Sequence, residues 1–199
     1  MTSNGTQTIF SKRDSNASSN GYDLSVVNNI VSFNWNGSGS ISSPYAVGTD
    51  RWYHIAVTHT GSLYKLYIDG IEVESSSGGS PGTNDNKSIL GAMDQEGNTD
   101  VNAKLTRTPV NHFNGWIDEF RVWNVALTEE QIHQSMNQEI IQDPSGFNVY
   151  GEVVPIDVHG LPWLSLQGYY RMDQISCGYL EGNFGVGVNG KLKNITSGE

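Results

Sequence analysis

The chain has 199 residues, 23 of them glycine, and 11 basic side chains stand against 21 acidic ones, for a formal net charge of −10. This length suits one domain with its own core. The charge disfavours nucleic acid and anionic membranes as partners, because binding to phosphate depends on Lys and Arg. The single cysteine, Cys177, excludes an intramolecular disulfide and a multi-thiolate zinc site. No segment is apolar enough to predict insertion into a membrane.

Short runs rich in Tyr, Val, Ile, Phe and Trp alternate with Gly, Ser and Asn clusters, a pattern typical of an antiparallel sandwich or barrel. The pair Asp69-Gly70 predicts a two-residue hairpin turn, because such turns need positive φ angles at both positions. The predicted strands, in chain order, are 8–12, 22–27, 30–35, 52–60, 62–69, 71–75, 88–92 and 113–123.

Only the segment 127–140 has a helical period. Thr128 is the predicted N-cap, and Gln131 three residues later completes a capping box. Prolines then predict a connector over 143–164, followed by more strands in 165–199.

Two motifs, WYHIAVTHTGSLYKLYIDGIEVESS and FNGWIDEFRVWNVALTEEQI, resemble the laminin-G-like branch of the concanavalin-A-like superfamily, particularly its bacterial members. The resemblance covers about residues 7 to 140 and implies an all-β fold, a two-sheet antiparallel jelly-roll sandwich with one short helix in the C-terminal half. The family begins with a strand like GYYRMD, which stands here at 168–173. We expect residues 1–199 to form a single sandwich, with 1–142 as its main body and 165–199 completing it. The alternative is that 165–199 begin a further module.

Two segments are also similar to pentraxins, the calcium-dependent ligand-binding members of the superfamily: SKRDSN at 11–16 and, displaced by one residue, SILGAMDQEG at 88–97. The resemblance implies that both segments meet at one edge of the sandwich and bind Ca²⁺, with Gln95 offering its backbone carbonyl. The oxygen donors of the loop 94–102 fit such a hard cation, although a solvated acidic turn would have the same composition. The ligands implied are Asp14, Asn16, Asp94, Gln95, Glu96 and Asp100.

Alternation along GWIDEFRVW predicts Asp118 among large apolar side chains, where a carboxylate needs a partner. Related glucanases and lectins place a calcium ligand in such a strand, so the resemblance implies a second site at Asp118, with Asp173 approaching from the C-terminal strand. The alternative is that Asp118 faces solvent or pairs with Arg171.

Aromatic rings can serve as platforms for sugars, because they offer flat area at low entropy cost. Most of the aromatic residues are expected in the core. Trp35 lies at a predicted strand end beside turn residues, so it is the predicted exposed ring, and Asn98 is assigned to ligand binding with it.

The fold's retaining glucanases carry two glutamates around an aspartate on one strand, and no such pattern occurs here. The sequence therefore predicts a non-catalytic, calcium-dependent module that binds carbohydrate or another surface ligand within a larger secreted or cell-surface protein, whose signal would lie outside this chain. Neighbouring domains of that protein are expected partners. The alternative is a structural spacer or adhesion repeat, and a glycoside hydrolase is less favoured.

Overall fold

The computed structural model describes residues 5–16, 20–95, 109–173, 175–176, 179–180 and 190–191. Every sheet in it is antiparallel, and within these ranges one α-helix accompanies the strands. The predicted all-β jelly-roll class is therefore confirmed. The chain divides into two compact units, Met1–Gly115 and Trp116–Glu199.

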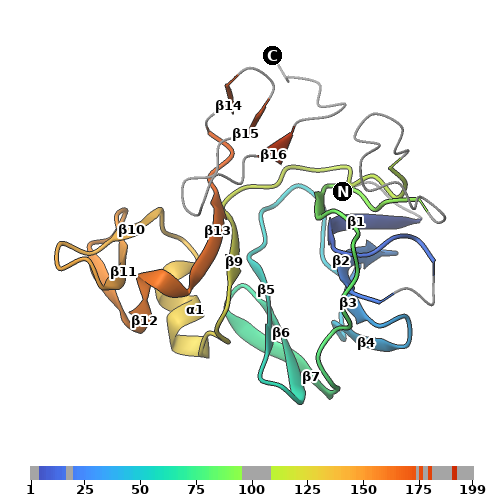
Figure 1. Cartoon of the computed structure of the whole chain (residues 1–199), viewed down its shortest axis with the longest axis horizontal. Coiled ribbons are helices and arrows are strands. Elements are labelled where there is room, and N and C mark those ends of the chain that lie inside the picture. The colour runs from blue at the N-terminus through green and yellow to red at the C-terminus, as the bar shows by residue number, and fades with distance from the viewer. Residues whose placement is uncertain are drawn as a thin grey trace. The chain divides into compact units, whose positions relative to one another are not determined.

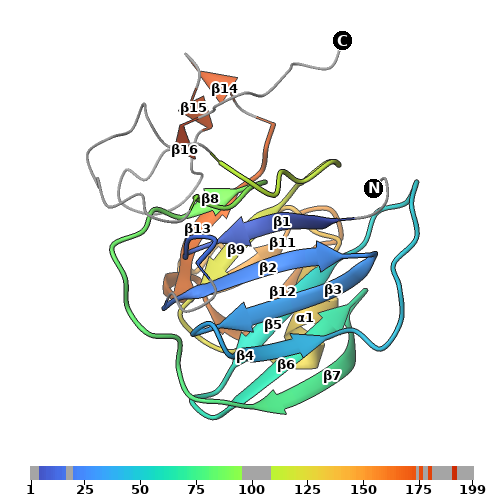
Figure 2. The same cartoon turned by 90° about the vertical axis from the view of Figure 1, so that its right-hand side faces the viewer.

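Unit 1 contains two sheets that face each other across an apolar core, as Figure 2 shows with the first sheet face on and the second behind it. The first has the strand order β4-β3-β2-β1-β8 and the second β5-β6-β7. The strands are β1 (Thr6–Ser11), β2 (Tyr22–Val27), β3 (Ile30–Trp35), β4 (Gly39–Ser42), β5 (Ile55–His59), β6 (Leu63–Ile68), β7 (Ile71–Ser77) and β8 (Ile89–Leu90).

Two hairpins of unit 1 turn through residues with positive φ angles. Asp69 and Gly70 have φ of 51° and 82°, which confirms the turn predicted between β6 and β7. Asn28 and Asn29 have φ of 51° and 66° between β2 and β3. Asn and Asp tolerate the left-handed region better than most residues, and Gly adopts it freely. Both pairs therefore suit the two-residue turn whose twist matches that of the flanking strands.

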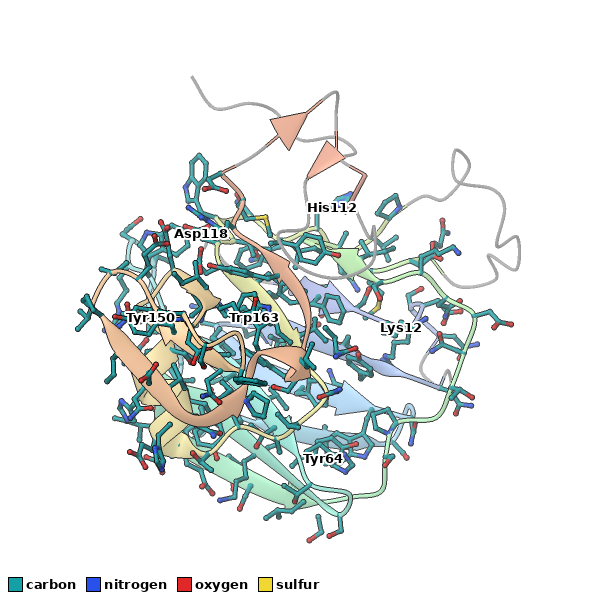
Figure 3. The ribbon with its side chains drawn as sticks, turned by 60° about the vertical axis from the view of Figure 1, so that its left-hand side comes forward. Lys12, Tyr64, His112, Asp118, Tyr150 and Trp163 are labelled. Atoms are coloured by element: carbon teal, nitrogen blue, oxygen red, sulfur yellow. The ribbon has the colours of Figure 1, made fainter. Side chains whose placement is uncertain are left out.

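The core of unit 1 is built around the indole of Trp35. This side chain is 5% exposed and stacks on the ring of Tyr64, with the centroids 3.9 Å apart (Figure 3 labels Tyr64). Gly39 and Gly78 lie directly against the indole, and a Cβ added at Gly78 would come within 2.6 Å of it. The close approach of these backbones therefore requires glycine at both positions.

Unit 2 holds the helix and the remaining strands (Figure 1). Its sheets have the orders β10-β11-β12, β13-β9 and β14-β15-β16. Of the helices in the described ranges, none has the length and apolarity of a membrane span. The elements are β9 (Phe120–Trp123), α1 (Glu129–Ser135), β10 (Ile140–Gln142), β11 (Asn148–Gly151), β12 (Ile156–Pro162), the 3₁₀ turn η1 (Trp163–Ser165), β13 (Leu166–Tyr170), β14 (Ile175–Ser176), β15 (Tyr179–Leu180) and β16 (Gly190–Lys191).

Helix α1 begins where the sequence predicts. The Thr128 side chain accepts from the Gln131 amide at 3.2 Å, and the Gln131 side chain accepts from the Thr128 amide at 3.0 Å. The reciprocal bonds satisfy two amides that a helix start leaves free. Ile132 is buried, and the helix contacts β12.

The prediction of a connector over 143–164 is wrong, because this segment contains β11 and β12. Val149, Val158 and Leu161 from these strands are at most 1% exposed and form the core of unit 2 with Leu166. The prolines do not prevent this, since β12 is an edge strand of its sheet in the described part of the chain and Pro162 is its last residue.

The strand predicted over 113–123 is also too long. Strand β9 starts at Phe120, because Glu119 has a φ of 53°, outside the range of a strand. The alternation that predicted an apolar environment for Asp118 therefore does not extend to that residue.

Candidate functional site

The two segments that resemble pentraxins meet at one edge of unit 1, as expected. Phe10 and Ser11 of β1 pair with Leu90 and Ile89 of β8, and beyond these strands Asp14 forms a parallel backbone bridge with Asp94. The Ser15 amide donates to the Asp94 carbonyl at 2.9 Å. We call this place the Asp14–Asp94 edge.

The two carboxylates at the edge differ in their surroundings. The Asp14 Oδ1 atom accepts from the Asn16 amide at 3.0 Å, which orients the Asp14 carboxylate. Asp94 is fully buried, whereas Gln95 beside it is exposed. A buried carboxylate needs hydrogen-bond donors or a cation, because an isolated buried charge is too costly.

The metal role of the edge stays a prediction. Among the described residues, no group of three or more His, Cys, Asp or Glu side chains is placed to hold a metal ion. Three residues assigned to this loop, Glu96, Asn98 and Asp100, lie outside the described residues.

Asp118 is exposed, so its predicted apolar surroundings are wrong (Figure 3). Its Oδ1 atom accepts from the Glu119 amide at 2.9 Å. Strand β13 pairs with β9 through Tyr170 and Phe120, so the C-terminal strand lies beside the strand that follows Asp118. Arg171, the alternative partner of Asp118, forms ion pairs with Glu139 at 2.8 Å and with Asp173 at 2.9 Å. A second metal site at Asp118 and Asp173 stays a prediction.

A charged network that the sequence did not predict lies next to Asp118. The Arg121 guanidinium donates to Glu119, to the Gln138 carbonyl and, at 2.7 Å, to the Ser135 carbonyl at the end of α1. Tyr169, which is 1% exposed, donates to Glu119 at 2.6 Å and accepts from the Ile140 amide at 3.2 Å. The network joins β9, β13, α1 and β10, so its role is structural.

The buried tyrosines predict a stability limit at alkaline pH. Burial, and then the hydrogen bond to Glu119, raise the pKa of Tyr169 to about 12, and burial raises the pKa of Tyr64 to about 12, from an ordinary value of 10.0. Between these pH values the unfolded chain releases protons that the folded chain retains, so the free energy of unfolding falls as pH rises. Urea unfolding midpoints should be flat below this window and fall within it.

Burial also raises the pKa values of Tyr22 and Tyr170. The Tyr169→Phe variant is the control for that experiment, because it lacks one of these groups and should show a smaller fall across the same window. Tyrosinate absorbance, followed in parallel, reports when the folded chain begins to ionise. A midpoint that stays constant across the window would contradict the raised pKa values.

Trp35 is not the exposed ring that the sequence predicted, because it is buried in the core of unit 1. Gly39, the first residue of β4 and the pairing partner of Trp35, and Gly78, just after β7, lie against the indole. Exposed aromatic side chains occur instead at Tyr45, Trp52, Trp116 and Phe147, which are 49%, 63%, 79% and 73% exposed.

A second unpredicted cluster lies on β2, on the side of the sheet away from the core. Asp23, 1% exposed, accepts from Arg13 at 2.7 Å, from Ser25 at 2.6 Å and from Asn34 at 3.0 Å. The alternation of Tyr22, Leu24 and Val26 toward the core is the signal that places Asp23 on this other side. No spacing in the sequence identifies Arg13 as its partner.

A family model described as the concanavalin A-like lectin/glucanases superfamily matches residues 1–133, and the chain belongs to this superfamily. Pappalysin-1 of Mus musculus is 32% identical over 100 residues, which are 47% of this chain and 5% of that protein. The chain thus spans a small part of that relative's length.

Several solved structures are similar to the chain. A candidate carbohydrate-binding protein from Bacteroides ovatus has a TM-score of 0.58 at 18% identity, covering 89% of this chain and 45% of that one. At that identity the likeness shows the fold alone. An S-layer domain-containing protein from Clostridium thermocellum is 26% identical, covering 67% of this chain and 64% of that one, and its TM-score of 0.35 supports no argument.

Proposed function

We propose that the chain is a calcium-dependent, non-catalytic module that binds carbohydrate, within a larger secreted or cell-surface protein. The observation that supports this most is the backbone bridge between Asp14 and Asp94. It joins two acid-bearing segments that are far apart in the chain, at the place where the resemblance implies a metal site.

The oxygen atoms at this edge are of the chemical type that hard cations bind. Calcium takes six to eight oxygen ligands, and Asp14 and Asp94 contribute carboxylates. The proposal assigns the remaining protein ligands to the other residues implied by the resemblance, which are Asn16, Gln95, Glu96 and Asp100. A bound calcium ion would supply positive charge and open coordination positions for sugar hydroxyl groups. Affinity for a glycan would then need no basic side chain, which suits a chain with a net charge of −10.

Carbohydrate is the favoured ligand because the superfamily contains lectins, and because a protein of similar fold is a candidate carbohydrate-binding protein. A binding role is favoured over hydrolysis, because the sequence lacks the spaced glutamates of the retaining glucanases.

The calcium proposal predicts a measurable loss in the Asp94→Asn variant. Isothermal titration with calcium chloride should give heat for the wild type, and Asp94→Asn should weaken the binding at least tenfold, because the amide carries no charge. Calcium at a hundredfold excess over its Kd should stabilise the wild type by about 2.7 kcal/mol, which EDTA should reverse in a melting curve.

Asp157→Asn is the matched control, because Asp157 is an exposed aspartate outside the edge to which no metal role is assigned, and calcium binding by this variant should equal that of the wild type. Asp14→Asn provides a second test should Asp94→Asn fold poorly, since Asp14 is the less buried of the pair. No heat with calcium and no effect of EDTA on melting would refute calcium dependence. A glycan array probed with and without EDTA tests the ligand class.

A further inference from the structure

The turn between β11 and β12 in unit 2 exposes a run of apolar residues. Val153 and Val154 are 63% and 59% exposed, Pro155 is exposed as well, and Ile156 is half-buried. Scattered apolar residues are normal on a protein surface, but a consecutive run is unfavourable unless something binds it. The turn is therefore a candidate interaction surface.

A buried glutamine holds this turn in place. The Gln138 side chain, 7% exposed, donates to the Val154 carbonyl at 3.1 Å and accepts from the Val154 amide at 2.8 Å. Gly151 makes room for it, since a Cβ at that position would come within 2.7 Å of the Gln138 side chain. The turn is ordered in the free chain, so little entropy would be lost when a partner binds.

Helix α1 and this turn line a common hollow, which we call the α1 groove. The helix contacts β12 (Figure 1), and the Gln134 side chain joins them by accepting from the His159 amide at 3.0 Å. The turn contributes Val154 and Ile156 to the lining, and the helix contributes Glu130 and Gln134. The groove has a volume of about 390 Å³, which lies within the range of known ligand sites.

The α1 groove lies in the most acidic part of the chain. Residues 116–173 contain nine Asp and Glu against two Arg, so they carry −7 of the formal net charge of −10. Both arginines already form ion pairs with carboxylates. Glu130 in the groove is exposed, as are Glu152 and Asp157 on either side of the apolar run. This field favours a positively charged partner.

We infer that the α1 groove binds a linear peptide segment of a partner protein, in which one aliphatic or aromatic side chain is flanked by Lys or Arg. The apolar side chain packs on Val154 and Ile156, and the basic side chains face Glu130. A second copy of this chain is disfavoured as the occupant, because each copy has a formal charge of −10. The groove shares no residue with the Asp14–Asp94 edge, so peptide binding needs no calcium.

The experiment screens the full chain, in EDTA, against an array of short peptides whose central Leu, Ile, Phe or Trp is flanked by Lys or Arg. We expect the wild type to bind members of this array, and fluorescence anisotropy then measures each Kd. Peptides with Glu in place of the basic residues, or Gly in place of the central one, should not bind, because they lack the charge attraction or the apolar contact. Raising NaCl from about 50 mM to about 500 mM should weaken binding through screening.

The Val154→Lys variant should raise the Kd about tenfold or more, because it places a positive charge in the groove. Val125→Lys is the matched control, since Val125 is an exposed valine of the same unit outside the lining, and its Kd should be close to that of the wild type. A second pair of variants separates direct contact from general charge. Glu130→Gln should weaken binding more than Glu129→Gln, because Glu129 is exposed beside it but does not line the groove.

Two peptide results would overturn the inference: no array peptide binds the wild type, or Val154→Lys loses no more affinity than Val125→Lys. Two other results would assign a different occupant. A dimer in light scattering that Val154→Lys dissociates would identify a second copy, and polysaccharide binding that Val154→Lys abolishes would identify a sugar. Melting curves verify that Val154→Lys is folded, which its exposure predicts. Should it unfold, the comparison of Glu130→Gln with Glu129→Gln decides.

Discussion

Replacing Trp35 by Ala is expected to lower the free energy of unfolding by about 3–5 kcal/mol, the usual cost of removing a large aromatic side chain from a core. The indole is 5% exposed and stacks on Tyr64, and Gly39 and Gly78 lie against it. These glycines have no side chain that could fill the space left behind. Urea unfolding, followed by circular dichroism, measures the loss.

Trp52→Ala is the control for this prediction, because it makes the same chemical change at a side chain that is 63% exposed. Its free energy of unfolding should stay within about 0.5 kcal/mol of the wild type. A loss below about 1 kcal/mol in Trp35→Ala would contradict the packing described for the core of unit 1.

Replacing Arg121 by Ala should also cost about 3–5 kcal/mol, because it breaks a largely buried ion pair and leaves its partners without a cation. The Arg121 side chain is 8% exposed and donates to Glu119, to Ser135 and to Gln138. Two of these partners are backbone carbonyls at the end of α1 and just after it. We therefore expect the rate of hydrogen exchange at the α1 amides to rise as the free energy of unfolding falls.

The Arg51→Ala variant is the matched control, because Arg51 and Asp69 form an ion pair that is largely exposed to solvent. Such pairs contribute at most about 1 kcal/mol. If Arg121→Ala cost no more than Arg51→Ala, the network in unit 2 would not have the structural role assigned to it.

The local features of the fold were predictable because their signals are local. Strands β2 and β3 have the predicted limits, and the Asp69-Gly70 turn and the capping box of Thr128 occur as expected. Each depends on residues within a few positions of one another, where alternation, turn chemistry and capping act.

The wrong predictions arose where one residue type outweighed the pattern around it. Prolines suggested a connector over 143–164, although Val149 of β11 and Val158 and Leu161 of β12 are buried in a core. At Trp35, neighbouring turn residues suggested exposure, whereas Gly39 of β4 and Gly78 after β7 allow the backbone to approach and cover the ring. In both cases the missing information was which distant segment packs on the residue.

The candidate site was predictable only through resemblance. Nothing in the spacing along the chain brings Asp14 to Asp94, and the same holds for Arg13 and Asp23. The α1 groove was not predictable either, because the turn at Val154 is held by Gln138, which lies 16 residues earlier in the chain.

The edge of β1 has a consequence for the synthesis of the protein. Besides β8, this strand receives the segment at His112, through a bridge with Thr8 and a bond from the Thr8 amide to the Asn111 carbonyl at 2.8 Å. During translation β1 therefore cannot complete its pairing until β8 and the segment at His112 have left the ribosome. At about 5–20 residues per second this takes several seconds after β1 itself is made. Until then one side of β1 is an open strand edge, the kind of surface on which chains aggregate, so we expect nascent chains that stall before Asn111 to depend on chaperones.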